Sequence, residues 1–146
     1  MQKRISLKHA EPAAYKAMLA FDAYTESIPV SNVHKDLIKI RASQINGCSY
    51  CIDMHTKEAR EHGEKEQRIY GLSSWRETPF FTDEERAILA LTEEVTLISN
   101  RVSDETYANA AKLLDEKYLS QVLMVILVIN SWNRIGVATN LIPSLS

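Results

Sequence analysis

The sequence predicts an all-α protein, and three observations support that fold class. Glycine and proline are scarce, with four of each in 146 residues, which favours helices over a turn-rich β design. Residues that cap helices, such as Ser31 and Thr82, precede segments with helical apolar periodicity. The run VLMVILVI at 122–129 is the one segment that resembles a strand, and an isolated strand would leave its backbone polar groups unsatisfied. It is therefore predicted to be a central helix that is apolar nearly all round.

The first two predicted helices lie on either side of a proline break. A helix over 12–26 begins with a proline in its first turn, and the Ile-Pro pair at 28–29 ends it. A second helix begins at Ser31 or Asn32 and carries a broad apolar stripe. It ends at the Asn-Gly pair at 46–47, because glycine readily adopts the left-handed conformation of a helix C-terminus.

A third helix is predicted from about Ser49 to His62, with Gly63 ending it. Since the link between the second and third helices is very short, the two are expected to fold back on each other. The sequence therefore predicts a central antiparallel helical hairpin.

The second half of the chain continues the helical pattern. A short helix is predicted over 65–75, and Thr82 with Glu85 forms a capping box in front of an amphipathic helix. Two further helices, over 103–116 and 120–139, each begin at a serine that suits an N-cap. With no repeat, low-complexity tract or flexible linker, residues 1–146 are predicted to form a single domain.

Composition and charge exclude several classes of partner. The 17 basic and 19 acidic residues are mixed along the chain and give a net charge of −2, so neither nucleic acid nor an anionic lipid surface is expected as a partner. The most apolar run has eight residues, whereas a bilayer-spanning helix needs about 20. Because the basic N-terminus is not followed by an apolar segment, it does not resemble a secretory signal. A cytoplasmic location is expected.

The segment NGCSYCIDMH at 46–55 holds both cysteines of the chain. On a helix that begins near Ser49, Cys48 lies at the N-terminal edge, Cys51 one turn further and His55 one turn beyond that, all on one face. A helix N-terminus and a nearby imidazole both lower the pKa of a thiol. A second cysteine allows an oxidised first one to be resolved as a disulfide. The spacing favours thiol-peroxide or thiol-disulfide chemistry.

Two other readings of the cysteine pair stay open. Cys48, Cys51 and His55 make three potential zinc ligands, but a structural zinc site needs four and no second cluster follows. No metal site is therefore expected, and an inert buried pair is the remaining alternative. Trp75 and Trp132 are predicted to be core residues.

A histidine acts as a base when a carboxylate fixes its tautomer, and Asp36 is the predicted partner of His55. His55 lies eight residues after Gly47 and Asp36 eleven before it. In an antiparallel hairpin this leaves a mismatch of only about one turn at about 1.5 Å per residue. Asp53, two residues from His55, points to another side of the helix. The remaining histidines, His9, His34 and His62, are read as surface residues.

These residues resemble the AhpD-like branch of the carboxymuconolactone decarboxylase superfamily. The resemblance is carried by DLIKIRASQINGCSYCIDMHTKEAREHGE, RIYGLSSWRETPFFTDEERAILALTEEVT and SWNRIGVA, which cover most of 33–138. Its specific feature is an acidic residue twelve positions before C-x-x-C-x-x-x-H. The resemblance implies an all-helical fold that assembles as trimers or hexamers and reduces hydroperoxides. It also implies electrons from a lipoyl-bearing protein and no metal or bound organic cofactor.

The motif residues of the family fall on Cys48, Cys51, His55 and Asp36. The family usually has glutamate at the position of Asp36, so a direct bond to His55 could here pass through a water. The best-known peroxidase of the branch has a histidine at the position of Tyr50, and tyrosine, with a pKa near 10, is a poor proton shuttle. The decarboxylase of the superfamily lacks the cysteine pair, which disfavours decarboxylation here.

The expected activity is therefore a thiol-dependent peroxidase. Cys51, assisted by His55, attacks an organic hydroperoxide, Cys48 closes the disulfide, and an external dithiol reduces it. Asp36 would hold His55, and Tyr50 would orient the leaving hydroxyl. Helix-terminus logic alone instead makes Cys48 the more acidic thiol. The alternative function is a non-enzymatic redox sensor or oligomeric binding protein with a reversible disulfide. The apolar run at 122–129 supports a homo-oligomer.

Overall fold

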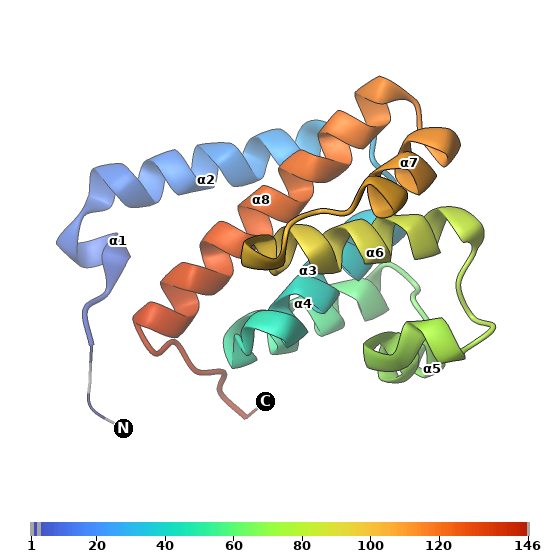
Figure 1. The fold of residues 1–146 in the computed structure, drawn as a ribbon. Coiled ribbons are helices and arrows are strands. Elements are labelled where there is room, and N and C mark those ends of the chain that lie inside the picture. Colours follow the sequence, from blue (N-terminus) through green and yellow to red (C-terminus); the bar gives the residue numbers. More distant parts are fainter. Residues whose placement is uncertain (1, 3, 146) are drawn as a thin grey trace.

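The computed structural model describes residues 2 and 4–145, and every regular element among them is helical (Figure 1). In chain order these are α1 (Leu7–Ala10), α2 (Pro12–Ser27), α3 (Asn32–Asn46), α4 (Ser49–Glu61), α5 (Glu66–Gly71), the 3-10 helix η1 (Leu72–Glu77), α6 (Asp83–Thr96), the 3-10 helix η2 (Ile98–Asn100), α7 (Asp104–Leu113) and α8 (Glu116–Ala138). The predicted all-α class is confirmed.

Helix α8 runs diagonally through the molecule and packs against α2, α3, α4, α6 and α7 (Figure 1). Its residues Val122, Val125, Ile126 and Ile129 are buried in the larger of two apolar clusters, together with Ile38 of α3. By length and composition α8 could cross a bilayer, but half of its most apolar stretch is buried inside the protein. The run at 122–129 is thus a core helix, as predicted.

Helices α3 and α4 form the expected hairpin. Ser31 caps α3 by accepting a hydrogen bond from the His34 N–H, and Gly47 ends it with φ 67° and ψ 31°. An L-residue rarely adopts this left-handed conformation. The N–H of Gly47 and that of Cys48 bond back to carbonyls near the end of α3, so the chain reverses within two residues and places Cys48 directly at the N-cap of α4.

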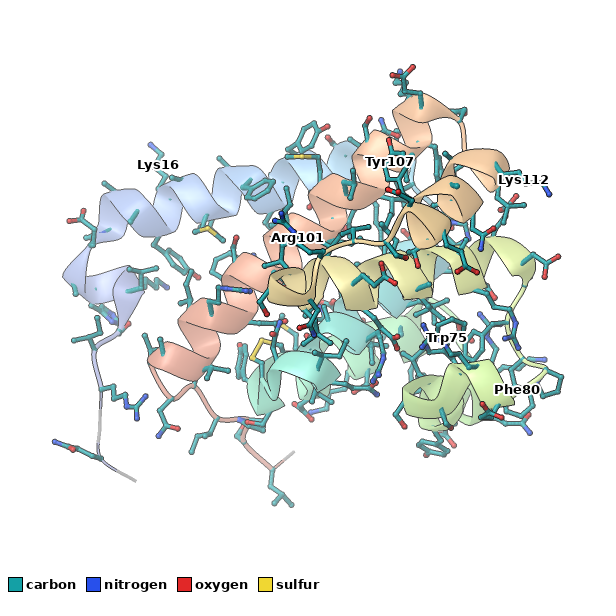
Figure 2. All side chains as sticks on the ribbon, viewed as in Figure 1. Lys16, Trp75, Phe80, Arg101, Tyr107 and Lys112 are labelled. Carbon is teal, nitrogen blue, oxygen red and sulfur yellow. A yellow bond between two sulfur atoms is a disulfide. The ribbon has the colours of Figure 1, made fainter. Side chains whose placement is uncertain are left out.

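A second apolar cluster, which includes Leu37, Leu72, Trp75 and Leu89, lies where α5 and η1 cover α3 and α6. Figure 2 shows Trp75 and Phe80 at this end of the molecule, away from both termini. The predicted capping box is present: Thr82 accepts from the Glu85 N–H, and Glu85 accepts from the Thr82 N–H.

Arg68 joins α5 to α6 in this region. Its Nε donates to Glu64 and its Nη2 to Glu85, both at 2.8 Å, and its Nη1 also bonds the Phe80 carbonyl. Both carboxylates are buried, so the guanidinium neutralises two charges that would otherwise be costly to bury.

Several elements differ from those expected, including α7, which ends at Leu113 and not near residue 116. Helix α1 was not predicted, and the 65–75 segment is divided into α5 and η1 with a kink at Ser74. The last helix begins at Glu116, not at Ser120. Asp115 provides its N-cap by accepting from the Tyr118 N–H, whereas Ser120 lies inside the helix and donates to the Glu116 carbonyl.

Candidate functional site

The two cysteines are joined by a disulfide in the first turn of α4. Cys48 is the N-cap residue and Cys51 lies one turn further, so the i, i+3 spacing places the two sulfurs side by side. Cys48 is 1% exposed and Cys51 4%. The C-x-x-C pair is therefore close enough to close a disulfide, as a redox cycle requires, in an almost fully buried position.

Gly136 of α8 packs directly on this disulfide. A Cβ atom at this position would lie 2.9 Å from the Cys48 Sγ and 3.6 Å from the Cys51 Sγ. The first distance is shorter than real contacts of a Cβ allow. A glycine here lets the backbone of α8 cover both sulfurs, a role that the sequence alone did not reveal.

Buried amides hold the turn before the cysteines against α8. Asn46 Nδ2 donates to the side-chain oxygens of Asn130 and Asn133, both at 3.0 Å. Asn133 Nδ2 in turn donates to Ser43 Oγ at 2.9 Å, and Asn130 Nδ2 to Thr96 Oγ1 at 3.0 Å. Because these groups satisfy one another away from water, the network fixes the position of the turn.

A pocket of about 1090 Å³ opens beside the disulfide. Its walls come from α1, α2, α3, α4, α8 and the segments at both ends of the chain. Cys51 and His55 line it together with the half-exposed Tyr50, whereas Cys48 is not among the residues that line it. Apolar side chains, including Leu19, Met54 and Ile135, make up much of the remaining wall.

Trp132 also reaches this pocket. It is half-buried, its Nε1 donates to Asp22 Oδ1 at 3.2 Å, and its ring meets that of Tyr15 edge to face. Trp75 is buried in the core as predicted, but Trp132 is a pocket residue.

In the structure Asp36 and His55, the predicted pair, each bond directly to a different side chain. His55 Nδ1 donates to Glu58 Oε2 at 2.8 Å, and Asp36 Oδ2 is 2.8 Å from His62 Nδ1. Glu58 lies three residues after His55 on the same helix, so this pairing needs no reach between helices. Asp36 has a short side chain, and the imidazole it meets belongs to His62 at the end of α4. The register argument was applied to His55 alone, although His62 is also about one turn from Asp36 along the hairpin.

The pKa values of the carboxylates of Asp36 and Glu58 are shifted in opposite directions. Burial raises the pKa of Asp36, although the hydrogen bond with His62 offsets part of that effect. The hydrogen bond with His55 lowers the pKa of Glu58 against the opposing effect of burial. Glu58 is therefore an anion at neutral pH and accepts the hydrogen bond from His55 Nδ1. Since Nδ1 donates to Glu58, Nε2 is the nitrogen of His55 left for proton transfer.

The described part of the chain holds no group of three His, Cys, Asp or Glu side chains arranged to bind a metal ion. His62, expected on the surface, is exposed but bound to Asp36. Glu58 and His62 are two further pocket residues that sequence reasoning missed. Their spacing from His55, three and seven residues, was a signal that could have placed them on the same face of α4.

Comparison with known proteins identifies the family of the chain. Residues 12–94 match the model of the carboxymuconolactone decarboxylase family. The chain is 45% identical over 139 residues to the uncharacterised protein YdfG of Bacillus subtilis, a match that covers 94% of this chain and 95% of YdfG.

Solved structures show the same fold. A protein of unknown function from Agrobacterium tumefaciens, for which an AhpD role in antioxidant defence has been suggested, superimposes with a TM-score of 0.96 at 36% identity and covers 99% of this chain and 100% of its own. The debrominase Bmp8 is similar with a TM-score of 0.83 at 18% identity over 91% of this chain and 73% of its own, a likeness of fold alone. The chain belongs to the carboxymuconolactone decarboxylase family and has the AhpD-like helical fold.

Proposed function

We propose that the protein is a thiol-dependent peroxidase that reduces organic hydroperoxides. The observation that carries the proposal is Cys51, which lines a large pocket while its sulfur pairs with Cys48 behind it. His55 lines the same pocket one helical turn away. A nucleophile, a resolving thiol and a proton-transfer group thus converge on one cavity.

The proposed reaction begins with the reduced pair. The Cys51 thiolate attacks one peroxide oxygen, the O–O bond breaks, and the departing alkoxide takes a proton from His55 to leave as an alcohol. Cys51 is now a sulfenic acid. Cys48 attacks its sulfur, water leaves with the Cys48 proton, and the disulfide forms. An external dithiol then reduces the disulfide and is itself oxidised.

The geometry favours Cys51 over Cys48 as the nucleophile. Cys51 lines the pocket, whereas Cys48 lies against Gly136 and is almost fully buried. A peroxide in the pocket therefore meets the Cys51 sulfur first. This outweighs the argument from the helix N-terminus, which lowers the pKa of the thiol nearest to the helix end.

The roles of the supporting residues follow from their contacts. Glu58, not Asp36, orients His55 and stabilises its charged form. We keep Tyr50 as a hydrogen-bond donor to the leaving oxygen, because it lies at the pocket wall next to Cys51. Asp36 influences the site through its hydrogen bond with His62.

The size of the pocket and its apolar walls support an organic hydroperoxide as the substrate. By family resemblance we propose a lipoyl-type dithiol as the reductant and a homo-oligomer, trimer or hexamer, in the cytoplasm. The proposed cycle needs no metal and no bound organic cofactor.

Steady-state consumption of cumene hydroperoxide with dihydrolipoamide tests the proposal. An enzyme consumes many equivalents of peroxide per chain. A redox sensor or binding protein stops after one equivalent, and that result would reject the peroxidase.

Two matched variants test the order of the cysteines. With a single addition of peroxide, Cys48→Ser is expected to form about one alcohol per chain and retain a sulfenic acid that a dimedone probe captures. Cys51→Ser is expected to form neither. The opposite pattern would make Cys48 the nucleophile.

A further inference from the structure

One wall of the pocket is formed where α2 meets α8. Four α2 residues line it from a single helix face: Tyr15, Leu19, Asp22 and Glu26. Trp132 lines it from α8. Among the described residues of α2, Thr25 alone is buried. The inner face of α2 therefore borders an open cavity and is not packed into the core.

The indole of Trp132 is held in one orientation on this wall. Its Nε1 donates to Asp22 Oδ1 at 3.2 Å, and its ring meets that of Tyr15 edge to face, with 6.0 Å between the ring centroids. Tyr15 can cover at most one face of the indole. Since Trp132 is half-buried and lines the pocket, it presents a rigid aromatic surface to whatever enters.

This aromatic surface lies close to the reacting sulfurs. Gly136 follows Trp132 by four residues on the same face of α8, and a Cβ atom on Gly136 would lie 3.6 Å from the Cys51 Sγ. The two α8 positions are about 6 Å apart along the helix axis. A ring that contacts the indole can therefore place an attached peroxide group, one carbon away, at the Cys51 sulfur.

The chemistry of the wall favours an aryl group over an alkyl group. Aromatic rings attract one another through a negative face and a positive edge, in addition to the gain from burial. The Asp22 carboxylate accepts from the indole N–H, which makes the ring more electron-rich. Tyr50 and Met54 of α4 also line the pocket, and a thioether packs well against aromatic rings.

Several cationic side chains at the pocket already have partners. Lys39 forms an ion pair with Glu26, and Lys35 donates to the Glu26 carbonyl. Arg4 donates to carbonyls at the end of α8. These bonds favour a neutral organic group over an anionic tail as the part of the substrate that the pocket recognises.

We propose that Trp132 is a specificity-determining residue that binds the organic group of the substrate, and that the substrate is an aryl-substituted hydroperoxide. This inference rests on the proposed peroxidase function and names the class of its substrate. Trp132 contacts the aryl group, whereas Tyr15 and Asp22 are positioning residues that hold the indole. The pocket of about 1090 Å³ has ample room for such a molecule.

The first experiment measures binding without turnover. Cumyl alcohol and tert-butanol, the alcohols formed from cumene hydroperoxide and tert-butyl hydroperoxide, differ by a phenyl group in place of a methyl group. Both are titrated into the oxidised parent and followed by saturation-transfer NMR and tryptophan fluorescence. The second tryptophan, Trp75, is buried in the other apolar cluster, so a change in fluorescence reports on Trp132.

Cumyl alcohol is expected to bind at least about tenfold more tightly than tert-butanol, through burial and ring contact, and to change the fluorescence. Equal affinities, or binding of cumyl alcohol with unchanged fluorescence, would overturn the inference. This comparison needs no variant, so it decides the matter even where a substitution at Trp132 prevents folding.

The second experiment compares variants by their substrate preference. Trp132→Leu keeps an apolar side chain without a ring, and Trp132→Phe restores a ring. Tyr107→Leu is the matched control, because Tyr107 is an exposed aromatic residue of α7 that does not line the pocket. For each protein, kcat/KM is measured with cumene hydroperoxide and with tert-butyl hydroperoxide, using dihydrolipoamide as the reductant.

Trp132→Leu is expected to lower the preference for cumene hydroperoxide about fivefold, the size of effect that an aromatic contact contributes, with little change for tert-butyl hydroperoxide. Trp132→Phe is expected to retain most of the preference and the control all of it. A purely structural role would slow both substrates equally and leave their ratio unchanged. Thermal unfolding of each variant shows whether it is folded.

An unchanged ratio in Trp132→Leu would overturn the inference, as would an equal loss in Trp132→Phe or in Tyr107→Leu. The two proposals can fail separately. Turnover of both peroxides without a preference that depends on Trp132 would reject this inference alone. Selective binding of cumyl alcohol at Trp132 without any peroxide turnover would reject the peroxidase and leave Trp132 as an aryl-binding residue.

Discussion

At the scale of single residues, the site depends on side chains that are small or short. Gly136 lets α8 cover the disulfide, and the short side chain of Asp36 bonds His62 while Glu58 bonds His55. Neither feature follows from the spacing of the motif. Each depends on which side chains of neighbouring helices come into contact when the helices pack.

Gly136→Ala is expected to destabilise the oxidised protein by about 1–2 kcal/mol. Overpacking typically costs about 1–3 kcal/mol, and the better helix propensity of alanine returns up to about 1 kcal/mol. Chemical denaturation of the parent and variant measures the difference. A stabilised variant would mean that the contact with Cys48 Sγ at 2.9 Å is relieved without strain.

At the scale of elements, the start of α8 lies at the residue whose side chain accepts from a free backbone N–H. The sequence predicts Ser120 as the N-cap of the last helix, but in the structure Asp115 accepts from the backbone at the start of α8. Asp115→Ala is expected to cost about 1 kcal/mol. Ser120→Ala, its control, should change stability little, because the serine lies inside the helix. Urea denaturation compares them, and a larger loss in Ser120→Ala would contradict the observed boundary.

Arg68 fastens α5 to α6 through two buried carboxylates, Glu64 and Glu85. Arg68→Met is expected to destabilise the protein by about 3–5 kcal/mol, because it leaves buried charges without a partner. Lys112→Met, which removes an exposed charge on α7, should stay within about 0.5 kcal/mol. Guanidinium denaturation is the measurement. Equal effects of the two substitutions would show that the buried pairs contribute nothing.

The hydrogen bonds between Arg68 and Glu85 also predict that the stability of the protein depends on pH. Burial by itself would raise the pKa of Glu85, but hydrogen bonds from Arg68 and the Thr82 N–H lower it overall. The folded pKa lies below the unfolded value of about 4.3, so this contribution to stability is complete above that value and is lost as the pH falls through the folded pKa. Unfolding curves at falling pH should show the loss in the parent and a smaller loss in Arg68→Met. Parallel pH curves would contradict the assignment.

At the scale of the whole molecule, local sequence signals were sufficient for most of the architecture. The cap at Ser31, the left-handed Gly47 and the capping box at Thr82 are interactions within a few residues, and the structure confirms each. They also placed the cysteine pair at the start of α4.

Interactions between distant segments could not be predicted in this way. The pairing of Asp36 with His62, the approach of Gly136 to the sulfurs and the pocket position of Trp132 depend on how helices far apart in the sequence pack. The shared helix face of His55, Glu58 and His62 was readable from their spacing, but their hydrogen-bond partners were found only in the structure.

Arg4 ties the N-terminal segment to the end of α8, where its guanidinium bonds the carbonyls of Val137 and Ala138. Arg4→Met is expected to remove about 1 kcal/mol of local stabilisation and to raise amide hydrogen exchange about fivefold in α1, with little change in α3. Exchange followed by mass spectrometry tests this. Unchanged exchange in α1 would mean that the segment is held by other contacts.

The pocket is bounded in part by both ends of the chain, through Ile5 and Leu7 on one side and Leu141 and Ile142 on the other. Figure 1 shows the two ends on the same side of the molecule. A purification tag or fusion partner at either end would therefore lie close to this pocket. Kinetic comparisons are best made on protein from which such additions have been cleaved. A tag that blocks access to the pocket would lower the reaction rate without any change in the catalytic residues.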